Sequence, residues 1–388
     1  MISFDNTKIA FRSKSSRDLK RTYRLFKLVS NPKAVKLGQW LTKVALNFHL
    51  PVKWIIKKTI FKQFCGGESI TESLRVVDKL ADYGVSTILD YSVEGKIKEE
   101  DFDQTVNEII ATIEVAKKNP NIPFAVFKIT GICLFEVLES TNESCKHLEP
   151  ELQDKYDKLL ERVNKICCAA YENNVPLFID AEETWIQNTI DRIVKQMSIK
   201  YNKQKAIIFN TVQLYRHDKL KFLNTEINDA KLGGYFLGMK LVRGAYMEKE
   251  RKRAQLMGYP SPIQANKELC DKDFDSGLRI VLENIEHVAL CSGTHNEMSS
   301  KKLVELIKEF NIQKHDSRIY FAQLYGMSDH ISFNLADNNY NVAKYVPYGP
   351  IKEVVPYLIR RAEENTSVAG QTSRELTLIM KERKRRRL

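Results

Sequence analysis

The sequence predicts an α/β protein built on a distorted (β/α)8 barrel of the TIM type, with a helical extension at its N-terminus. Two observations support this fold. After residue 85, a short apolar or β-branched run followed by an amphipathic helical stretch recurs eight times. No Gly-x-Gly-x-x-Gly fingerprint or P-loop follows the first run, although an open doubly wound sheet usually carries such a fingerprint. Eight units of this kind favour a closed barrel.

The eight runs are short and end in polar residues, as parallel strands of a barrel do. They lie at 87–94, 124–130, 176–183, 207–213, 238–244, 288–295, 319–326 and 342–349. Between them, segments such as 156–171 and 299–310 carry apolar residues at helical spacing. Strand and helix therefore alternate, as parallel crossover connections require.

The chain before residue 85 has no strand pattern. Its apolar residues recur at helical spacing among lysines, first at Leu37, Trp40, Leu41, Val44 and Phe48, and then at Val52, Ile55, Ile56 and Ile60. We therefore expect three regions. These are a basic amphipathic helical extension over 1–85, the barrel over 86–373, and a basic C-terminal tail over 374–388.

The formal net charge of +12 is concentrated at the two ends of the chain. Between residues 19 and 67 there are eleven Lys or Arg and no Asp or Glu, and a second basic cluster lies at 381–388. The extension can pack on the barrel with its lysines solvated, or it can lie on an anionic lipid surface. Nucleic-acid binding is the weaker interpretation, since aromatic stacking platforms are sparse, and we expect no nucleic-acid partner.

The composition is typical of a soluble globular protein. Of the 388 residues, 43% are hydrophobic and 28% are charged, which allows a substantial core. The seven cysteines form no Cys-x-x-Cys pair, so we expect neither a metal site nor a disulfide framework. No apolar run approaches 18 residues and no signal-peptide pattern opens the chain, which favours a cytoplasmic protein.

In a closed barrel, chemistry takes place at the C-terminal ends of the strands. Any one polar residue there can be a satisfied structural group, but a whole rim of them favours a functional site. The polar residues expected at this rim are Asp90, Lys128, Asp180, Glu182, Gln213, Lys240, Arg243, Thr294, His295, Gln323 and Tyr345.

Two adjacent arginines lie on an otherwise apolar helix face after the last strand. At about 100° per residue, Val354, Tyr357, Arg360, Arg361 and Glu364 fall on one side of the helix. Burying two cations requires a nearby anion, because each charge-assisted hydrogen bond returns only about 1.5–3 kcal/mol against the cost of desolvation. The alternative is a solvated edge on which the arginines pair locally with neighbouring glutamates.

Three motifs on successive parts of the rim together closely resemble proline dehydrogenase. They are Lys240-Leu-Val-Arg-Gly-Ala-Tyr-Met-Glu-Lys-Glu-Arg251, Ser292-Gly-Thr-His-Asn296, and Tyr345-Val-Pro-Tyr-Gly-Pro350 with Tyr357-Leu-Ile-Arg-Arg-Ala-Glu-Glu-Asn365. The resemblance runs from about residue 66 to about residue 373. It includes Leu89-Asp-Tyr-Ser-Val-Glu94 and Asp180-Ala-Glu-Glu183, and it is most specific in the C-terminal half. The extension and tail resemble those of monofunctional members.

The resemblance implies an FAD enzyme that oxidises L-proline to Δ1-pyrroline-5-carboxylate. Hydride would pass to flavin N5 and electrons onward to a membrane quinone, as the first step of proline degradation. The alternatives are a hydroxyproline dehydrogenase, or a basic non-enzymatic scaffold or nucleic-acid-binding protein.

The resemblance also assigns roles to substrate residues. Arg360 and Arg361 would clamp the substrate carboxylate with Lys128 adding charge, and Glu364 would hold the guanidinium groups or face the amine. Tyr345 would pack on the ring edge, where members acting on 4-hydroxyproline tend to have a smaller residue. Asp180 would orient neighbouring groups.

Flavin contacts are implied for Gln213, Lys240, Arg243, Gly244, Ala245, Tyr246, Thr294 and His295. Many bacterial members read Arg-Leu-Val-Lys-Gly-Ala-Tyr-Trp where this chain has Lys240-Leu-Val-Arg-Gly-Ala-Tyr-Met247. The two cation types are thus exchanged, which leaves open whether Lys240 or Arg243 lies beside flavin N5.

The resemblance implies partners as well. The chain has no room for the DNA-binding and aldehyde dehydrogenase modules of bifunctional relatives, so a separate pyrroline-5-carboxylate dehydrogenase would receive the product. The basic N-terminal region would bind an anionic membrane surface. We expect a peripheral location on the inner face of the cell membrane, or on the mitochondrial inner membrane if the source is eukaryotic.

Overall fold

The computed structural model describes residues 2–31, 53–93, 97–143, 148–367 and 371–388, and its strands form a closed parallel barrel in the order β1-β2-β3-β4-β5-β6-β7-β8. The predicted fold class is therefore confirmed. The strands are β1 (Ser86–Tyr91), β2 (Phe124–Lys128), β3 (Leu177–Asp180), β4 (Ile208–Gln213), β5 (Leu237–Val242), β6 (Val288–Gly293), β7 (Ile319–Leu324) and β8 (Val342–Tyr348). Each begins within a residue of its predicted start, because a β-branched, apolar run is a strong strand signal.

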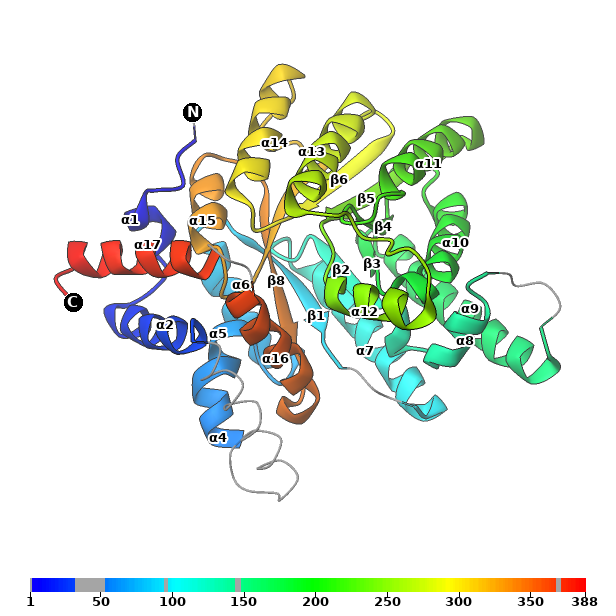
Figure 1. The fold of residues 1–388 in the computed structure, drawn as a ribbon, viewed down its shortest axis with the longest axis horizontal. Helices are drawn as coiled ribbons and strands as arrows, with labels where there is room; N and C mark the ends of the chain where they lie inside the picture. The colour runs from blue at the N-terminus through cyan, green and yellow to red at the C-terminus, as the bar shows by residue number, and fades with distance from the viewer. Residues whose placement is uncertain (1, 32–52, 94–96, 144–147, 368–370) are drawn as a thin grey trace. The chain divides into compact units, whose positions relative to one another are not determined.

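The helices alternate with the strands (Figure 1). Before β1 come α1 (Thr7–Ala10), α2 (Ser16–Val29), α4 (Lys53–Ile56), the π-helical turn η1 (Lys57–Phe61), α5 (Lys62–Phe64) and α6 (Ile70–Ala81). Between the strands lie α7 (Glu99–Lys118), the 3₁₀ turn η2 (Ile129–Gly131), α8 (Phe135–Ser140), α9 (Pro150–Glu172), α10 (Thr184–Tyr201), α11 (Lys219–Gly233), α12 (Met247–Met257), α13 (Lys267–Glu283), α14 (Glu297–Glu309) and α15 (Asp329–Asp337). After β8 come α16 (Ile351–Ser367) and α17 (Gln371–Arg385).

The chain divides into two compact units. Unit 1 comprises Met1–Glu94 and Gln323–Leu388, and unit 2 comprises Gly95–Ala322. The predicted boundaries at residues 85 and 373 stay a prediction, because this division follows contact density rather than the order of motifs.

Unit 2 consists of parallel strands with their crossover helices. The register runs Lys128 opposite Asp180 between β2 and β3, and Lys240 opposite Cys291 between β5 and β6. Local sequence fixes the helix ends: the Asn296 side chain accepts hydrogen bonds from the first backbone N–H groups of α14, and Gly234 ends α11 in the left-handed conformation. Polar residues at strand ends are thereby brought into one unit.

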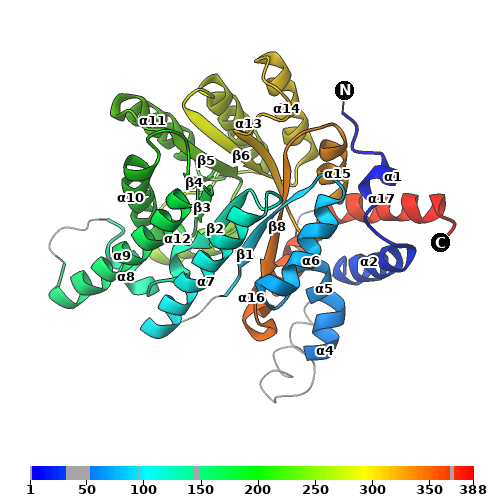
Figure 2. The ribbon, with the colours of Figure 1, turned by 180° about the vertical axis from the view of Figure 1, so that it is seen from behind.

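Unit 1 joins the two ends of the chain. The described part of the N-terminal extension is helical, as predicted, whereas the repeat from Leu37 to Phe48 lies outside the described residues. Figures 1 and 2 show α1, α2 and α17 side by side, and Phe11, Leu19, Phe26, Leu378 and Ile379 are buried together between them. The basic C-terminal tail is thus an amphipathic helix whose apolar side is covered.

Candidate active site

The C-terminal ends of β2 and β3 bring three charged side chains together, which we call the rim cluster: Lys128, Asp180 and Lys240. Asp180 is ion-paired with Lys240, and its other carboxylate oxygen lies 3.9 Å from Lys128 Nζ. Lys240 is buried and its ammonium lies 5.1 Å from the centre of the Phe178 ring. One carboxylate thus lies between two ammonium groups, and ammonium groups near strand ends can bind an anionic ligand.

Arg243, just beyond the end of β5, is held by three directed hydrogen bonds. Its guanidinium donates to Asp271 Oδ1 at 2.8 Å, to Thr294 Oγ1 at 2.7 Å and to Ser299 Oγ at 2.9 Å. Burial acts to raise the pKa of Asp271, but hydrogen bonding from Lys267 and the charge of Arg243 hold it below its ordinary value. The guanidinium also stacks on the Phe274 ring, with its carbon 4.4 Å from the ring centre. Arg243 is therefore a fixed cation rather than a mobile one.

Asp271 and Ser299 were not predicted from the sequence. Both lie on helices, on α13 and α14, where a polar residue has no local signal that separates a structural role from a solvated one. The one hint in the sequence is that each helix adjoins a predicted strand, so its side chains can lie near the end of β5. Contacts at the rim depend on helix packing, so tertiary structure is needed to find them.

The glycine after Arg243 has a conformation that other residues rarely adopt. Gly244 has φ of +137°, and a Cβ atom at this position would lie 2.5 Å from the Tyr215 ring. Ala245 is exposed, and Tyr246 is half-buried directly before α12. The absence of a side chain at residue 244 therefore makes room for the Tyr215 ring.

The remaining predicted flavin contacts lie at the ends of β4 and β6. Gln213 is buried, and its amide nitrogen donates to the Glu182 backbone carbonyl at 2.7 Å. Thr294 is buried and His295 is half-buried, directly after β6. Unit 2 therefore gathers the eight predicted cofactor residues from β4, β5 and β6, at the C-terminal ends of neighbouring strands.

Glu182, one of the polar residues expected at the rim, is a buried carboxylate. Its two oxygens accept hydrogen bonds from the Thr130 backbone N–H at 3.1 Å and from the Thr130 hydroxyl at 2.5 Å. Burial raises the pKa of Glu182 to about 7, in spite of these hydrogen bonds and the charge of Lys128. The carboxylate ties η2, which follows Lys128, to the β3 end that carries Asp180.

The four predicted substrate residues of unit 1 lie on β8 and α16. Tyr345 is buried within β8, Arg361 is 7% exposed, and Arg360 is half-buried. The Arg361 guanidinium carbon lies 5.0 Å from the centre of the Tyr357 ring. Glu364 belongs to α16, but its side chain lies outside the described residues. The expected apolar helix face with a buried cation is present at Val354, Tyr357 and Arg361.

The arrangement supplies fixed positive charge and buried polar contacts at strand ends. Within the residues that the structure describes, no group of three or more His, Cys, Asp or Glu side chains is placed to hold a metal ion. Cationic side chains aimed at ligand charge can bind a carboxylate or a phosphate and can stabilise negative charge that develops in a reaction.

A protein-family model described as proline dehydrogenase matches residues 73–374. Proline dehydrogenase 1, mitochondrial, of Dictyostelium discoideum is 34% identical over 99% of this chain and 75% of its own length. The human protein of the same name is 40% identical over 61% of this chain and 40% of its own length. Hydroxyproline dehydrogenase of Xenopus laevis is 29% identical over 97% of this chain and 88% of its own length.

Solved structures of proline utilization A (PutA) share the fold. The PutA of Bdellovibrio bacteriovorus, inactivated by N-propargylglycine, superposes with a TM-score of 0.73 at 20% identity, over 93% of this chain. A PutA with proline bound in remote sites gives a TM-score of 0.67 at 19% identity, over 80% of this chain. This chain spans 38% and 31% of those two proteins. At such identities the likeness establishes the barrel architecture.

Proposed function

We propose that this chain, which belongs to the proline dehydrogenase family, oxidises L-proline to Δ1-pyrroline-5-carboxylate with FAD as its hydride acceptor. The observation that carries the proposal is the arginine pair of α16, directly after β8, with Arg361 buried on the apolar face of the helix. A buried guanidinium at this point is suited to the carboxylate of an amino or imino acid.

The residues of unit 2 fit a flavin. Arg243 offers a fixed cation, Gly244 leaves room for the neighbouring Tyr215 ring, and the Gln213 amide is held in place by Glu182. When bound, FAD would accept a hydride at N5. Lys240 and Arg243 would hold the pyrophosphate and the ring system, and positive charge beside the ring favours the reduced anion. Gln213, Ala245, Tyr246, Thr294 and His295 would complete the binding residues.

The substrate role falls to α16 and β8. Arg360 and Arg361 would bind the carboxylate and so orient the ring, and Tyr345 would limit the space at the ring edge. Lys128 remains the predicted third cation, and Asp180 would keep Lys128 and Lys240 in place. No covalent intermediate with the protein is required, so the contribution of these side chains is alignment and charge.

Hydroxyproline is the second candidate substrate, because a hydroxyproline dehydrogenase is among the similar relatives. Tyr345 would favour proline, since its ring would fill the space that a smaller residue would leave for a hydroxyl group. Comparing kcat/KM for L-proline and trans-4-hydroxy-L-proline decides between them. A higher value for the hydroxylated substrate would reverse the assignment.

A membrane quinone is the proposed electron acceptor, and α2 is the proposed contact with an anionic membrane. Arg17, Lys20, Arg24 and Lys27 are exposed on this helix, and a pocket beside them is lined by Ser16, Arg17, Lys20, Arg21 and Arg24. Each basic residue near an anionic surface contributes about 1 kcal/mol. Within the described residues no helix is long and apolar enough to cross a membrane.

The mitochondrial names of similar relatives fit a location at the mitochondrial inner membrane, whereas a bacterial source would place the protein on the inner face of the cell membrane. A separate pyrroline-5-carboxylate dehydrogenase would receive the product in either case.

The decisive experiment is a visible spectrum of the purified protein before and after anaerobic addition of L-proline. Bleaching of the flavin absorbance supports cofactor and substrate together. Flavin that stays oxidised rejects proline as the substrate, and a protein that cannot be loaded with FAD rejects the flavoenzyme proposal.

The clamp and the membrane contact have their own tests. Arg361→Met is expected to raise KM for L-proline about 100-fold by removing a charge-assisted contact, and an unchanged KM rejects the clamp.

Lys20→Glu with Arg24→Glu is expected to abolish flotation with phosphatidylserine vesicles. Lys117→Glu with Lys118→Glu, an exposed pair at the end of α7, is the matched control.

A further inference from the structure

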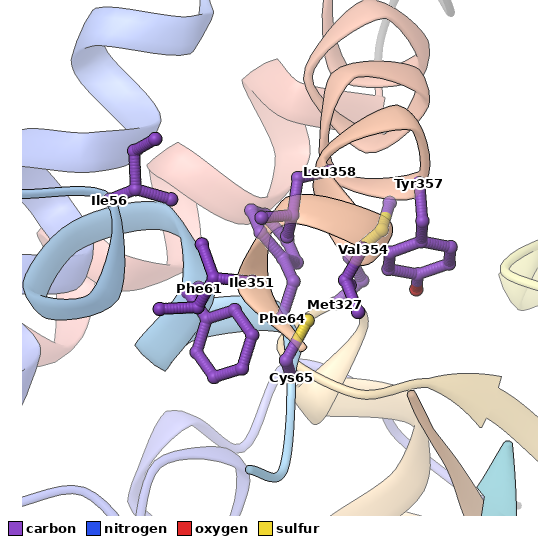
Figure 3. Close-up of a cluster of buried hydrophobic side chains, with 9 residues drawn as sticks. All are labelled: Ile56, Phe61, Phe64, Cys65, Met327, Ile351, Val354, Tyr357 and Leu358. Atoms are coloured by element: carbon purple, nitrogen blue, oxygen red, sulfur yellow. The ribbon is translucent and has the colours of Figure 1, made fainter. Parts of the chain in front are cut away.

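The apolar side of α16 packs against residues 56–65, which lie within the N-terminal extension. Val354, Tyr357 and Leu358 of α16 are buried in one cluster with Phe61 and Phe64. Ile56, Cys65, Met327 and Ile351 complete this cluster, and Figure 3 shows the side chains from these separate segments pointing toward one another. The helix that carries Arg361 therefore has residues far away in the sequence as its support.

The same segment also binds the turn from which α16 starts. The Gly66 N–H donates to the Pro347 carbonyl at 2.8 Å, and the Gly349 N–H donates to the Gly67 carbonyl at 3.1 Å. A Cβ atom on Gly66 would lie 2.7 Å from a methyl group of Val346. The backbone can pair with the end of β8 at this distance only because residue 66 has no side chain.

Gln63 fixes the segment to the loop after β7. Its amide nitrogen donates to the Gly326 carbonyl at 2.8 Å, and its amide oxygen accepts from the Thr22 hydroxyl at 3.3 Å. Gly326 has φ of +79°, and a Cβ atom there would lie 2.0 Å from the Gln63 carbonyl oxygen. Residues 61–67 are thus held by side-chain and backbone contacts on both sides, and we call them the brace.

The effect of the brace reaches Arg361 through one aromatic ring. Tyr357 is part of the buried cluster, and the Arg361 guanidinium carbon lies 5.0 Å from its ring centre, one helical turn further along α16. Moving Tyr357 would therefore move the arginine stacked on it. A π-helical turn, η1, leads into the brace, and such turns are common near functional sites.

We propose that residues 61–67 are positioning residues for the substrate carboxylate, because they set the placement of α16 and hence of Arg361. This inference rests on the proposed function. The brace does not touch the substrate; it acts through the Phe61, Phe64 and Tyr357 packing and through the Gly66 and Gly349 backbone hydrogen bonds.

Gly66→Ala tests the backbone contacts. We expect KM for L-proline, measured with a soluble dye as acceptor, to rise about tenfold while kcat stays within about twofold, because misplaced binding residues weaken substrate binding first. Gly233→Ala at the end of α11 is the matched control, since its added methyl would lie 2.8 Å from the Tyr235 ring. An equal KM change in both variants would overturn the positioning role.

Phe64→Leu tests the packing contact, with Phe102→Leu, a fully buried phenylalanine of α7, as its control. We expect the same selective rise in KM with unchanged flavin content.

Hydrogen exchange of the α16 amides is measured in parallel, and faster exchange over 351–361 in both brace variants is expected. Unchanged exchange overturns the inference even when KM rises. If the wild-type protein does not oxidise L-proline, the proposed function fails while the exchange result still decides whether the brace holds α16.

Discussion

Two regions of the molecule hold one aspartate between two lysines, yet they differ in burial and place along the strands. In unit 2 the rim cluster joins Asp180 to Lys128 and Lys240, two of which are the last residues of β2 and β3. In unit 1 Asp329, at the start of α15, lies 3.2 Å from Lys14 and 3.0 Å from Lys344, and we call these three residues the terminal cluster.

The terminal cluster is the more deeply enclosed of the two. The Lys344 side chain has no exposed surface, whereas that of Lys128 is 21% exposed. Lys344 also donates to the carbonyl oxygens of Met327 and Leu324, so its buried ammonium group has hydrogen-bond acceptors in addition to a counter-ion. The same three kinds of charge are therefore enclosed in one region and partly exposed in the other.

The two clusters differ in how deeply their charges are buried. A buried ion pair is useful for stability only when additional hydrogen bonds offset its desolvation, as they do around Lys344. At the rim, Asp180 lies between two ammonium groups, and the Lys128 side chain is partly exposed. We therefore expect the two regions to differ in their response to substitution and to pH.

Replacing the central carboxylate of the terminal cluster should destabilise the protein. Asp329→Asn is expected to lower the free energy of unfolding by about 3–5 kcal/mol, because it leaves the Lys344 ammonium buried without its counter-ion. Turnover per folded molecule should change little. Denaturant unfolding followed by circular dichroism measures the first quantity. A large loss of kcat/KM in folded protein would contradict the separation of roles.

The equivalent change in the rim cluster should act on activity. Asp180→Asn is expected to lower kcat/KM for L-proline about 100-fold, which corresponds to about 2.7 kcal/mol, by releasing Lys128 and Lys240 from their shared partner. The loss in unfolding free energy should be smaller than for Asp329→Asn. Denaturant unfolding of both variants, measured in parallel, provides the comparison. Equal destabilisation would remove the distinction between the two clusters.

Asp329 and Glu182 should contribute to stability with opposite pH dependence. Burial acts to raise the pKa of Asp329, but Lys14 and Lys344 hold it at about 2. A depressed carboxyl pKa contributes stability that is present above about pH 4 and is lost as the pH falls toward 2. The expected loss is about 2 kcal/mol. Unfolding free energies measured at stepwise lower pH should show it, and Asp329→Asn should lack this part of the slope.

Glu182 should give the reverse dependence, because its pKa is raised to about 7 by burial. A raised carboxyl pKa contributes stability that is complete below about pH 4.5 and is lost as the pH rises through 7. In the wild-type protein the free energy of unfolding should fall by on the order of 2 kcal/mol between about pH 5 and pH 8, and Glu182→Gln should remove this decrease. Thr130→Val, which removes one hydrogen-bond donor to this carboxylate, should raise its pKa further. A wild-type stability that is constant across this range would reject the assignment.

Local sequence was sufficient for the strands and for most of the rim. Lys128, Asp180 and Gln213 could be placed because each ends a β-branched run, and the ends of parallel strands meet at one edge of the barrel. Arg361 could be placed on an apolar face because helical periodicity relates it to Val354 and Tyr357. In contrast, the hydrogen bonds of Arg243 to Asp271 and Ser299 join a strand end to two helices, and no periodicity relates these residues.

By itself, the sequence determined the alternation of strands and helices, the polar strand ends and the family, since all three depend on residue types at short, regular spacing. Only the tertiary structure decided which Asp–Lys cluster is enclosed, that Glu182 is buried against Thr130, and that residues 61–67 support α16. The reason is that burial and charge pairing depend on contacts between segments far apart in the chain. Lys14 reaches Asp329, and Phe64 joins the buried cluster that contains Tyr357, only once the two ends of the chain are packed together.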